Sequence, residues 1–391
     1  MKIAGVAIAM QASGTGLARW RSLADAALAE LGPSDAPIII GSCNGAADEL
    51  DAASWSRAFA ELGNLPIASA ACASGLHALW VAQARLAHDC DEVIVLASDI
   101  VSPASHGNFE TLRVLDDTPA PWQPTSGGFR EGEAAVAIRL QRGAGVVGPL
   151  LGNDNLAALV TRIGTEHVAF AIGQGTGPAS VDARELAALP PHVPIATALA
   201  SCGHTIGASG LLSVALATGA RADLLAMPVA TAMDGRPLGV PRDARGDVLV
   251  MCRALGGACA VVKLGDGDVR QRSCWVEPQP APAMRLPLLR RIAALPRPAT
   301  LPDAIVVRLD APLAPPEDAR IGTRLLPSVV LEITPGFLSQ LVSSVWGFCG
   351  PAVTLVGGSD EGWVPTLAAI RHVHGEVLVL HVHGRDFEWG T

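Results

Sequence analysis

Short apolar runs alternate with segments of helical periodicity over the first 265 residues. Strands are indicated where β-branched and other apolar residues run together, and helices where apolar residues recur every three or four positions. The predicted strands are 2–9, 36–41, 66–70, 92–97, 168–172 and 195–197, the predicted helices are 15–31, 75–87, 182–189 and 207–218, and an apolar block closes the region at 248–264. This alternation predicts an α/β fold with a mixed sheet covered by helices.

Two stretches interrupt the pattern. Residues 103–128 are rich in Pro, Ser, Asp and Gly and are expected to be mostly loop, of the kind that often lines a site. Prolines become dense again between 277 and 316, which predicts a connecting segment. We therefore divide the chain into a region at 1–265, a Pro-rich connecting segment at 266–316 and a C-terminal part at 317–391.

The C-terminal part resembles an earlier part of the same chain. The run FCGPAVTLVGGSDEGWVPTLAAIRHVHGEVLVLHVH aligns with GNLPIASAACASGLHALWVAQARLAHDCDEVIVLAS when Gly350 is set on Gly63, with a two-residue deletion later on. Ser359 then falls on Cys72 and Gly362 on Gly75. We interpret the C-terminal part as a degenerate repeat of the segment that contains Cys72.

The composition narrows the choice of function. Half of the 391 residues are hydrophobic and only 17% are charged, which favours a well-buried protein over a disordered one. A net charge of −9 without a Lys/Arg run argues against nucleic acid as a partner. No uncharged apolar run approaches the ~20 residues that cross a bilayer, and the first residues lack the pattern of a secretory signal. We expect a cytoplasmic protein with no membrane partner.

The eight cysteines lie far apart, without the spacing of a zinc site, so we expect reduced thiols, no disulfide framework and no metal. Cys72 stands out because it follows a predicted strand and precedes a predicted helix. Backbone N–H groups at a helix start favour thiolate over thiol, as covalent acyl chemistry requires. Taken alone, the run Ala-Cys-Ala-Ser-Gly fits a packing cysteine equally well.

Five motifs in order resemble the β-ketoacyl synthases, a thiolase-fold family of condensing enzymes, and the resemblance covers roughly residues 1–265. Ala71–Gly75 resembles the nucleophile motif of that family, and the other matches follow it along the chain. These are Gly128-Phe129-Arg130-Glu131-Gly132-Glu133-Ala134, Gly175-Thr176-Gly177 with Asp182 and Glu185, Gly203-His204-Thr205-Ile206-Gly207-Ala208-Ser209-Gly210, and Leu255-Gly256-Gly257-Ala258-Cys259.

The resemblance implies a fold and a set of roles. The fold would be thiolase-like, with α-β-α-β-α layers and mixed sheets, followed by the degenerate C-terminal half-repeat. Cys72 would accept an acyl group, His204 would polarise the thioester or assist proton transfer, and Gln174 would orient the second substrate. Substrate-binding positions would be Phe129, Thr176, Leu255 and Gly256, and the backbone N–H groups of Cys72 and Leu255 would form an oxyanion hole.

The same resemblance implies partners and a pathway. The substrates would be thioesters of acyl carrier protein or coenzyme A in polyketide or fatty-acid-like biosynthesis, with no cofactor and no metal. We also expect a homodimer, or a heterodimer with another ketosynthase-like subunit, because thiolase-fold proteins generally pair through a strand of the central sheet. The C-terminal part could itself cover the surface that such a dimer uses.

Two positions depart from the family pattern. Gln174 stands where the first active-site histidine is expected, and Leu199 stands five residues before His204 in place of a lysine. A glutamine amide donates a hydrogen bond but cannot carry positive charge or shuttle a proton at neutral pH. Acyl transfer or an unusual condensation is therefore favoured over ordinary decarboxylative condensation.

Alternative readings remain for several residues. A non-catalytic partner subunit, similar to a chain-length factor, is the rival function, and retention of Cys72 and His204 argues against it. Asp182 and Glu185 are expected to support structure more than chemistry. A cluster of four C-terminal histidines invites a metal site, but alternation along a strand explains His381 and His383 equally well, and the cluster lacks the ligand spacing of nearby Cys or carboxylate residues. These histidines are His372, His374, His381 and His383.

Overall fold

The computed structural model describes most of the chain. Its described residues are 1–43, 66–254, 256–267, 269, 271, 273–275, 287–310, 320–321, 324–325, 335–383 and 386–390. Leu255, which the sequence placed in the substrate site, lies outside them.

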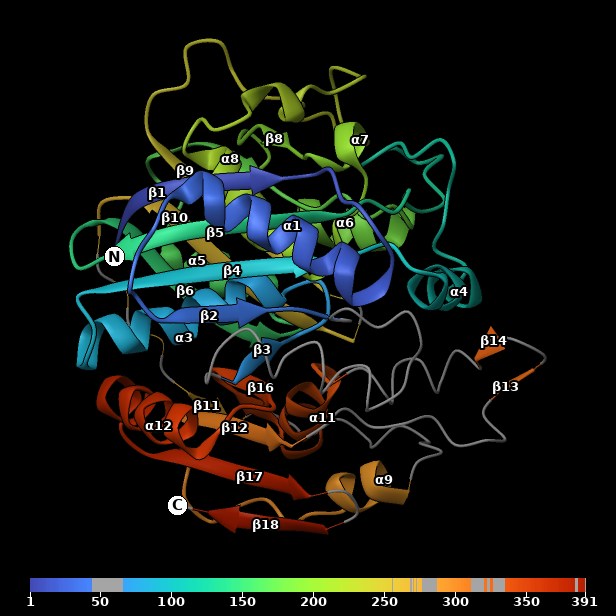
Figure 1. The fold of residues 1–391 in the computed structure, drawn as a ribbon. Coiled ribbons are helices and arrows are strands. Elements are labelled where there is room, and N and C mark those ends of the chain that lie inside the picture. Colours follow the sequence, from blue (N-terminus) through green and yellow to red (C-terminus); the bar gives the residue numbers. More distant parts are fainter. Residues whose placement is uncertain are drawn as a thin grey trace.

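A first sheet carries the segment around Cys72. Its strands are β1 Lys2–Ala9, β2 Ile38–Gly41, β3 Ile67–Ser69, β4 Glu92–Asp99 and β5 Ala134–Gln141. They lie in the order β1-β5-β4-β2-β3, with β2 parallel to both β3 and β4 and with β5 antiparallel to both β4 and β1. The strand β3 therefore lies at the end of this set (Figure 1).

A second sheet lies opposite the first. Its strands are β6 Gly145–Asn153, β7 Val168–Ile172, β8 Ile195–Ala196, β9 Asp247–Arg253 and β10 Ala258–Gly265, in the order β6-β10-β9-β7-β8. The strand β7 is parallel to β8 and β9, whereas β10 is antiparallel to β6 and β9. Both sheets are mixed, as expected from the sequence.

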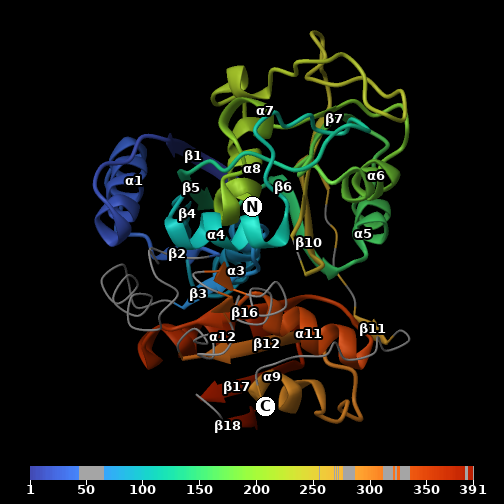
Figure 2. The same ribbon diagram turned by 90° about the vertical axis from the view of Figure 1, so that its right-hand side faces the viewer.

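Helices separate and cover the two sheets. The central helices α3 Ser74–His88 and α8 Ser209–Ala217 lie between the sheets and contact strands of both. Because α3 is buried nearly all round, it is apolar on all faces rather than along one stripe. The helix α1 Gly16–Leu31 covers the outer face of the first sheet, and α5 Leu156–Ile163 and α6 Ala179–Ala187 lie outside the second (Figure 2). The predicted α-β-α-β-α layering is confirmed.

A C-terminal unit, which we define as the described residues from 287 to 390, extends the first sheet. The strand β16 Ala352–Val356 pairs antiparallel with β3, and the sheet continues in the order β16-β12-β17-β18 (Figure 1). The other elements of the unit are α9 Pro287–Ala293, β12 Ala304–Leu309, β13 Arg320–Ile321, β14 Arg324–Leu325, α11 Phe337–Trp346, β15 Phe348–Cys349, α12 Asp360–His374, β17 Val377–His383 and β18 Asp386–Gly390. The helix α12 packs against α3.

Short elements complete the described chain. They are α4 Pro103–Leu112, α7 Leu199–Cys202, the 3₁₀ helices η1 Ile206–Ala208 and η2 Ala222–Leu225, and β11 Cys274–Trp275, which pairs with β15. The expectation of a loop over 103–128 was wrong for its first part, where α4 forms. Its start is fixed by a capping box between Ser102 and Ser105 with Pro103 in the first turn, a local signal that the polar composition obscured.

The segment predicted as a connector, 266–316, contains α9 and the sheet strand β12. A Pro-rich composition indicated irregular chain, but 304–309 is an uninterrupted apolar strand between parallel neighbours. We therefore propose that α9 and β12 belong to the C-terminal unit, whereas the sequence analysis began that part of the chain at residue 317.

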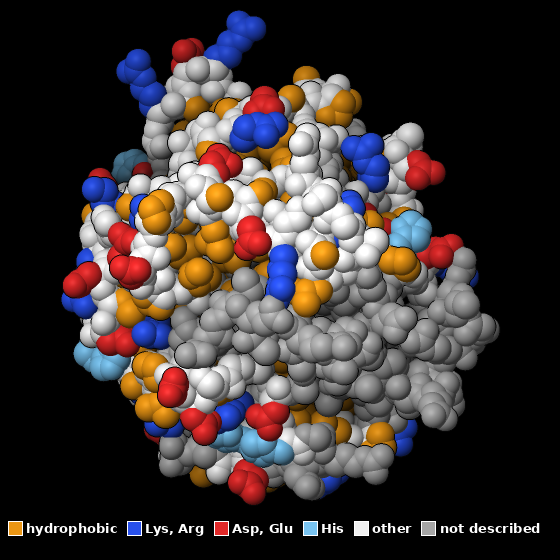
Figure 3. Space-filling model, in the orientation of Figure 1, with side chains coloured by type: hydrophobic (Ala, Val, Ile, Leu, Met, Phe, Trp, Pro, Cys, Tyr) orange, Lys and Arg blue, Asp and Glu red, His pale blue; other side chains and the backbone are white. Residues whose placement is uncertain are grey.

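Charges on the face shown in Figure 3 are mixed. Where this face is described, Lys/Arg and Asp/Glu side chains are interspersed, without a broad region of one sign. Helices in the described part of the chain are either too short or too polar to cross a bilayer.

Gly41 sets how closely β2 approaches α3. A Cβ atom there would lie 2.7 Å from the Ser74 carbonyl oxygen and 2.9 Å from Gly75 Cα. We expect Gly41→Val to lower the free energy of unfolding by about 1–3 kcal/mol, because overpacking forces the strand and the helix apart. Gly107→Ala is the control, since nothing lies within 4 Å of a Cβ atom there. Denaturant titration of both variants measures the effect, and unchanged stability of Gly41→Val would contradict it.

Candidate active site

Cys72 lies at a sharp turn between β3 and α3. Ala71 adopts the left-handed region with a φ of 49°, and Cys72 is 4% exposed. The Ser74 hydroxyl holds this turn, because it donates to the Ala71 carbonyl oxygen at 2.6 Å and accepts from the Ala70 N–H at 2.9 Å. The thiol therefore stands next to the first turn of a helix, where the helix dipole favours negative charge.

His204 is the partner of this thiol. Its Nε2 lies 3.0 Å from Cys72 Sγ, and its Nδ1 lies 3.1 Å from the hydroxyl of Ser209. Ser209 in turn lies within hydrogen-bond distance of Thr205. The tautomer that donates from Nδ1 to Ser209 leaves Nε2 free to accept the thiol proton. The structure thus brings together two residues that lie 132 positions apart in the sequence.

The surroundings of His204 keep the ring neutral. Burial lowers the pKa of His204 from 6.5 to about 4. The ring of Phe129 lies edge-on at 4.6 Å between centroids, and Phe109 of α4 packs against Phe129 at 5.1 Å. Leu199 is buried in the same apolar cluster. An imidazole that is neutral above pH 4 is available as a base over the physiological range.

Gln174 lies after β7 with its amide fixed on one side only. Its Oε1 accepts the backbone N–H of Arg253 at 3.0 Å, and its carbonyl oxygen accepts the hydroxyl of Thr197 at 2.9 Å. Its Nε2 is buried and lacks an oxygen acceptor among the described residues, and a hydrogen bond from the Gln174 side chain lowers the pKa of the Cys252 thiol. A thiol is a weak acceptor, so a carbonyl oxygen of a bound group would satisfy this N–H better.

Two buried carboxyl groups shape the loop around Gln174. Glu185 accepts the backbone N–H groups of Gln174 and Gly175 and the indole N–H of Trp122, all at 2.8–2.9 Å. Asp182 accepts the N–H groups of Gly177 and Trp122, at 2.9 and 2.8 Å. Burial raises the pKa of both, that of Asp182 to about 7. These contacts support the structural role expected for the two acids.

The glycines of the motifs allow loops to cross. A Cβ atom on Gly177 would lie 2.2 Å from the Gly128 carbonyl oxygen, and one on Gly132 would lie 2.1 Å from that of Cys202. His204 donates its backbone N–H to Arg130 at 2.7 Å. The loop at 128–132 therefore holds the Gln174 loop and the His204 segment together.

Two further thiols lie near Cys72, at positions that no pattern in the sequence indicated. The Cys252 thiol donates to the Cys72 carbonyl oxygen at 3.2 Å. Cys43 lies close enough to Cys72 for a thiolate at Cys72 to raise the pKa of the Cys43 thiol. Burial raises the pKa of both thiols well above the usual value. A hydrogen bond from the Gln174 side chain lowers the pKa of Cys252, but burial has the larger effect. These two cysteines therefore stay protonated, which leaves Cys72 with His204 as the reactive pair.

The remaining predicted binding positions are distributed unevenly. Phe129 packs on His204, whereas Thr176 is partly buried beside the Gln174 loop. Gly256 faces the C-terminal unit, because a Cβ atom there would lie 2.6 Å from the ring of Phe337. Gly336 packs as closely against Ala70. Sequence reasoning missed Phe109 and Phe337, although the Ser102–Ser105 capping box pointed to the helix of Phe109. It placed Ser209 within a motif and counted Cys252 among the cysteines, without assigning either of them to the site.

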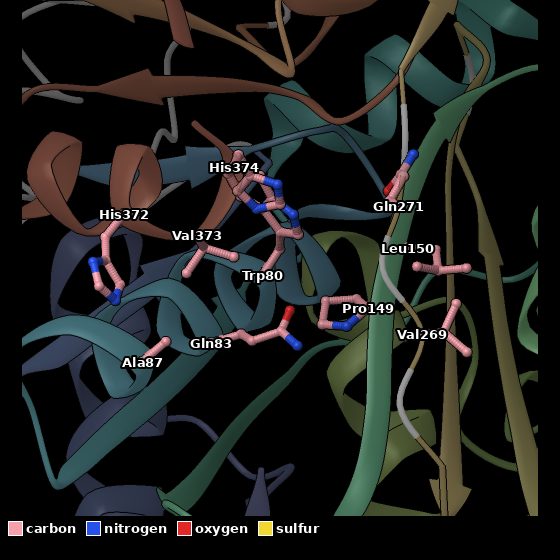
Figure 4. Close-up of a pocket in the computed structure, with 10 residues that line it drawn as sticks. All are labelled: Trp80, Gln83, Ala87, Pro149, Leu150, Val269, Gln271, His372, Val373 and His374. Atoms are coloured by element: carbon pink, nitrogen blue, oxygen red, sulfur yellow. The ribbon is translucent and has the colours of Figure 1, made fainter. Parts of the chain in front are cut away.

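A separate cavity of about 310 Å³ lies between α3, α12 and β6 (Figure 4). Trp80, Gln83 and His374 are among its lining residues, and Cys72 is not. The His374 ring stacks on Trp80 at 4.7 Å, and burial lowers its pKa to about 4. The described residues contain no group of three or more His, Cys, Asp or Glu that could hold a metal ion.

Comparison with known proteins gives a family for part of the chain. Residues 17–144 match the sequence model of the family "Beta-ketoacyl synthase, N-terminal domain". No curated protein sequence matches the chain significantly.

Solved structures give the fold. A β-ketoacyl synthase from Burkholderia phymatum STM815 is 18% identical, with 65% of this chain and 83% of that chain covered and a TM-score of 0.51. The PfaC keto synthase-chain length factor is 13% identical, with 95% of this chain and 66% of that chain covered and a TM-score of 0.65. A chain of the ketosynthase ApeO complex with its chain length factor ApeC, from Xenorhabdus doucetiae, is 18% identical, with 66% and 85% covered and a TM-score of 0.50. The thiolase-like fold is confirmed.

The low pKa of His204 is testable by titration. We expect its ring resonances to titrate near pH 4 rather than 6.5. Because burial favours the neutral ring, its contribution to stability is complete above pH 6.5 and is lost as the pH falls towards 4. An NMR titration of ¹⁵N-histidine-labelled protein measures the pKa, and His204→Gln identifies the resonance. Titration near pH 6.5 would contradict a dry site.

Proposed function

We propose that this chain, a relative of the β-ketoacyl synthases whose residues 17–144 carry the N-terminal domain of that family, transfers acyl groups through an acyl-Cys72 intermediate. The observation that supports this most directly is the 3.0 Å contact between Cys72 Sγ and His204 Nε2 in a buried, apolar site. A buried thiol beside a neutral imidazole at a helix start is the arrangement that nucleophilic acyl transfer needs.

Acylation follows from this geometry. His204 Nε2 accepts the Cys72 proton, and the thiolate attacks the thioester carbonyl carbon. The bond between that carbon and the sulfur of the donor breaks, and the departing thiolate takes the proton from His204. The products are acyl-Cys72 and the free donor thiol, with His204 neutral again.

The second step is the reaction of acyl-Cys72 with a second substrate, and the Gln174 amide indicates its type. The buried Nε2 of Gln174, which has only the weakly accepting Cys252 thiol as an acceptor among the described residues, is a neutral hydrogen-bond donor for the carbonyl oxygen of the second substrate. It cannot carry the positive charge that a second imidazole would offer to an enolate, and Leu199 supplies no cation. Acyl transfer to an acceptor, or an unusual Claisen-type condensation, is therefore favoured over ordinary decarboxylative condensation.

We propose thioesters of acyl carrier protein or coenzyme A as donors, in polyketide or fatty-acid-like biosynthesis in the cytoplasm. The family assignment of residues 17–144 supports an acyl-transferring or condensing enzyme in general. A homodimer, or a heterodimer with another ketosynthase-like subunit, stays a prediction. Any such subunit would have to bind away from β3, since β3 already pairs with β2 and β16.

A non-catalytic partner subunit is the alternative function. It is favoured by the fold likeness to the keto synthase-chain length factor PfaC, which covers 95% of this chain. The intact Cys72–His204 pair speaks against it, because a purely structural subunit has no need of a thiol and an imidazole in contact.

Formation of acyl-Cys72 is the first test. After incubation with acyl carrier protein or coenzyme A thioesters, intact-protein mass spectrometry is expected to find one acyl group per chain, and none on Cys72→Ala. His204→Ala is expected to slow acylation by about 10²-fold or more, because it removes the proton acceptor. Cys202→Ala is the matched control, since burial raises the pKa of that thiol to about 11. No adduct with any donor would favour the non-catalytic alternative.

The role of Gln174 is tested on the second step alone. We expect Gln174→Ala to lower transfer from acyl-Cys72 to the second substrate by about 10-fold or more, because a hydrogen-bond donor to the reacting carbonyl is lost. Acylation of Cys72 should change less than two-fold or so, since it does not use that amide. Gln83→Ala, in the separate cavity, is the control. Single-turnover measurements separate the steps, and equal losses in both would contradict the assignment.

A further inference from the structure

Two parts of the chain have the same topology. In the first, β2 is parallel to β3 and β4, α3 joins β3 to β4, and β5 is antiparallel to β4. In the C-terminal unit, β12 is parallel to β16 and β17, α12 joins β16 to β17, and β18 is antiparallel to β17. The strands β2, β3, β4 and β5 thus correspond to β12, β16, β17 and β18, in the same chain order.

The turn before the helix is also repeated. With Gly350 set on Gly63, Ala71 falls on Gly358, and the two have φ values of 49° and 89°. Cys72 falls on Ser359, and the helices α3 and α12 begin within two residues of them. The left-handed residue that positions a nucleophile is therefore present in both copies, whereas the thiol is present in one.

The two copies meet in a symmetric register. The same alignment makes Ile67 equivalent to Thr354, Ala68 to Leu355 and Ser69 to Val356. The observed antiparallel pairs are Ile67 with Val356, Ala68 with Leu355 and Ser69 with Thr354. Exchanging each residue for its equivalent reproduces the same three pairs. A local two-fold axis therefore passes through the pair Ala68–Leu355.

The helices meet across the same axis. The ring of Trp80 in α3 stacks on that of His374 in α12, with 4.7 Å between the ring centroids. The ring centroids of His88 in α3 and His372 in α12 lie 5.0 Å apart. A surface that contacts its own equivalent through a two-fold axis is the mark of an isologous dimer interface. Here both sides of that interface belong to one chain.

We propose that the C-terminal unit is a built-in partner, which occupies the edge of β3 where a second copy of this chain would otherwise bind. The unit also reaches the Cys72 site, because Gly336 packs on Ala70 and Phe337 packs on Gly256. The chain therefore holds one Cys72 site closed by its own C-terminal unit, and a second copy does not pair at β3. This inference concerns assembly and stands whether or not Cys72 is acylated.

The pair on the axis offers a direct test in the full chain. Residues directly opposite in an antiparallel ladder have Cα atoms about 4.5–5.5 Å apart, which lies within the range that a disulfide spans. With an internal partner, the variant Ala68→Cys/Leu355→Cys forms a disulfide within one chain on oxidation, found as a linked peptide by mass spectrometry. Ala68→Cys alone forms no link between chains.

The outcome that would overturn the proposal is equally definite. If β3 paired with β3 of a second copy, the axis would bring two copies of position 68 together, and Ala68→Cys alone would link two chains. Ser69→Cys/Thr354→Cys is a second double variant, in case the loss of Leu355 unfolds the first. Failure of both folded double variants to link within the chain would also overturn it. Hydrogen exchange of β3 should be independent of protein concentration, whereas concentration-dependent protection would indicate a second copy.

Discussion

The antiparallel pairing of β3 with β16 is the contact on which the rest of the structure depends. The strand β3 has only three residues, and a single residue pair, Gly41 with Ala68, registers it on β2. Three pairs register it on β16. The strand that ends in Ala71 and Cys72 is therefore held at least as firmly by the C-terminal unit as by its own half of the sheet. Because an unpaired edge strand is a site of aggregation or of further pairing, β16 also satisfies an edge that the first five strands leave open.

The chemistry of the site follows from burial more than from formal charge. Burial keeps His204 neutral and keeps the Cys43 and Cys252 thiols protonated, so one thiol and one base form the reactive pair. Gln174 and Leu199 are buried beside this pair and are uncharged, so neither adds a cation to the site. A site of this kind stabilises a developing oxyanion through fixed dipoles, which act strongly in a dry environment.

The sequence predicted the fold where local pattern and tertiary role agree. Strands such as β1 and β7 and the central helix α3 lie where apolar runs or periodicity indicated, and the motif glycines mark loops that do cross. Prediction failed at α4, where the polar residues hid a helix that brings Phe109 to the site. It also could not locate Cys252 or Phe337, because their proximity to Cys72 and Gly256 depends on packing between elements far apart in sequence. Leu255 lies outside the described residues, so its assignment is still a prediction.

The asymmetry between the two copies has a physical reason. Around Cys72, the imidazole and the amide come from segments that follow the strands of the second sheet, and loops such as 128–132 hold them over α3. Among the described residues, the C-terminal unit contributes no strand to the second sheet, and α12 packs on α3 and β17. The sheet whose loops supply His204 to Cys72 therefore has no counterpart in the described part of the unit. The left-handed turn at Gly358 persists because it connects β16 to α12, which the interface with β3 and α3 requires. We infer that the described part of the C-terminal unit shares with the first sheet the strand, turn and helix that the interface needs, and not the thiol and imidazole that catalysis needs.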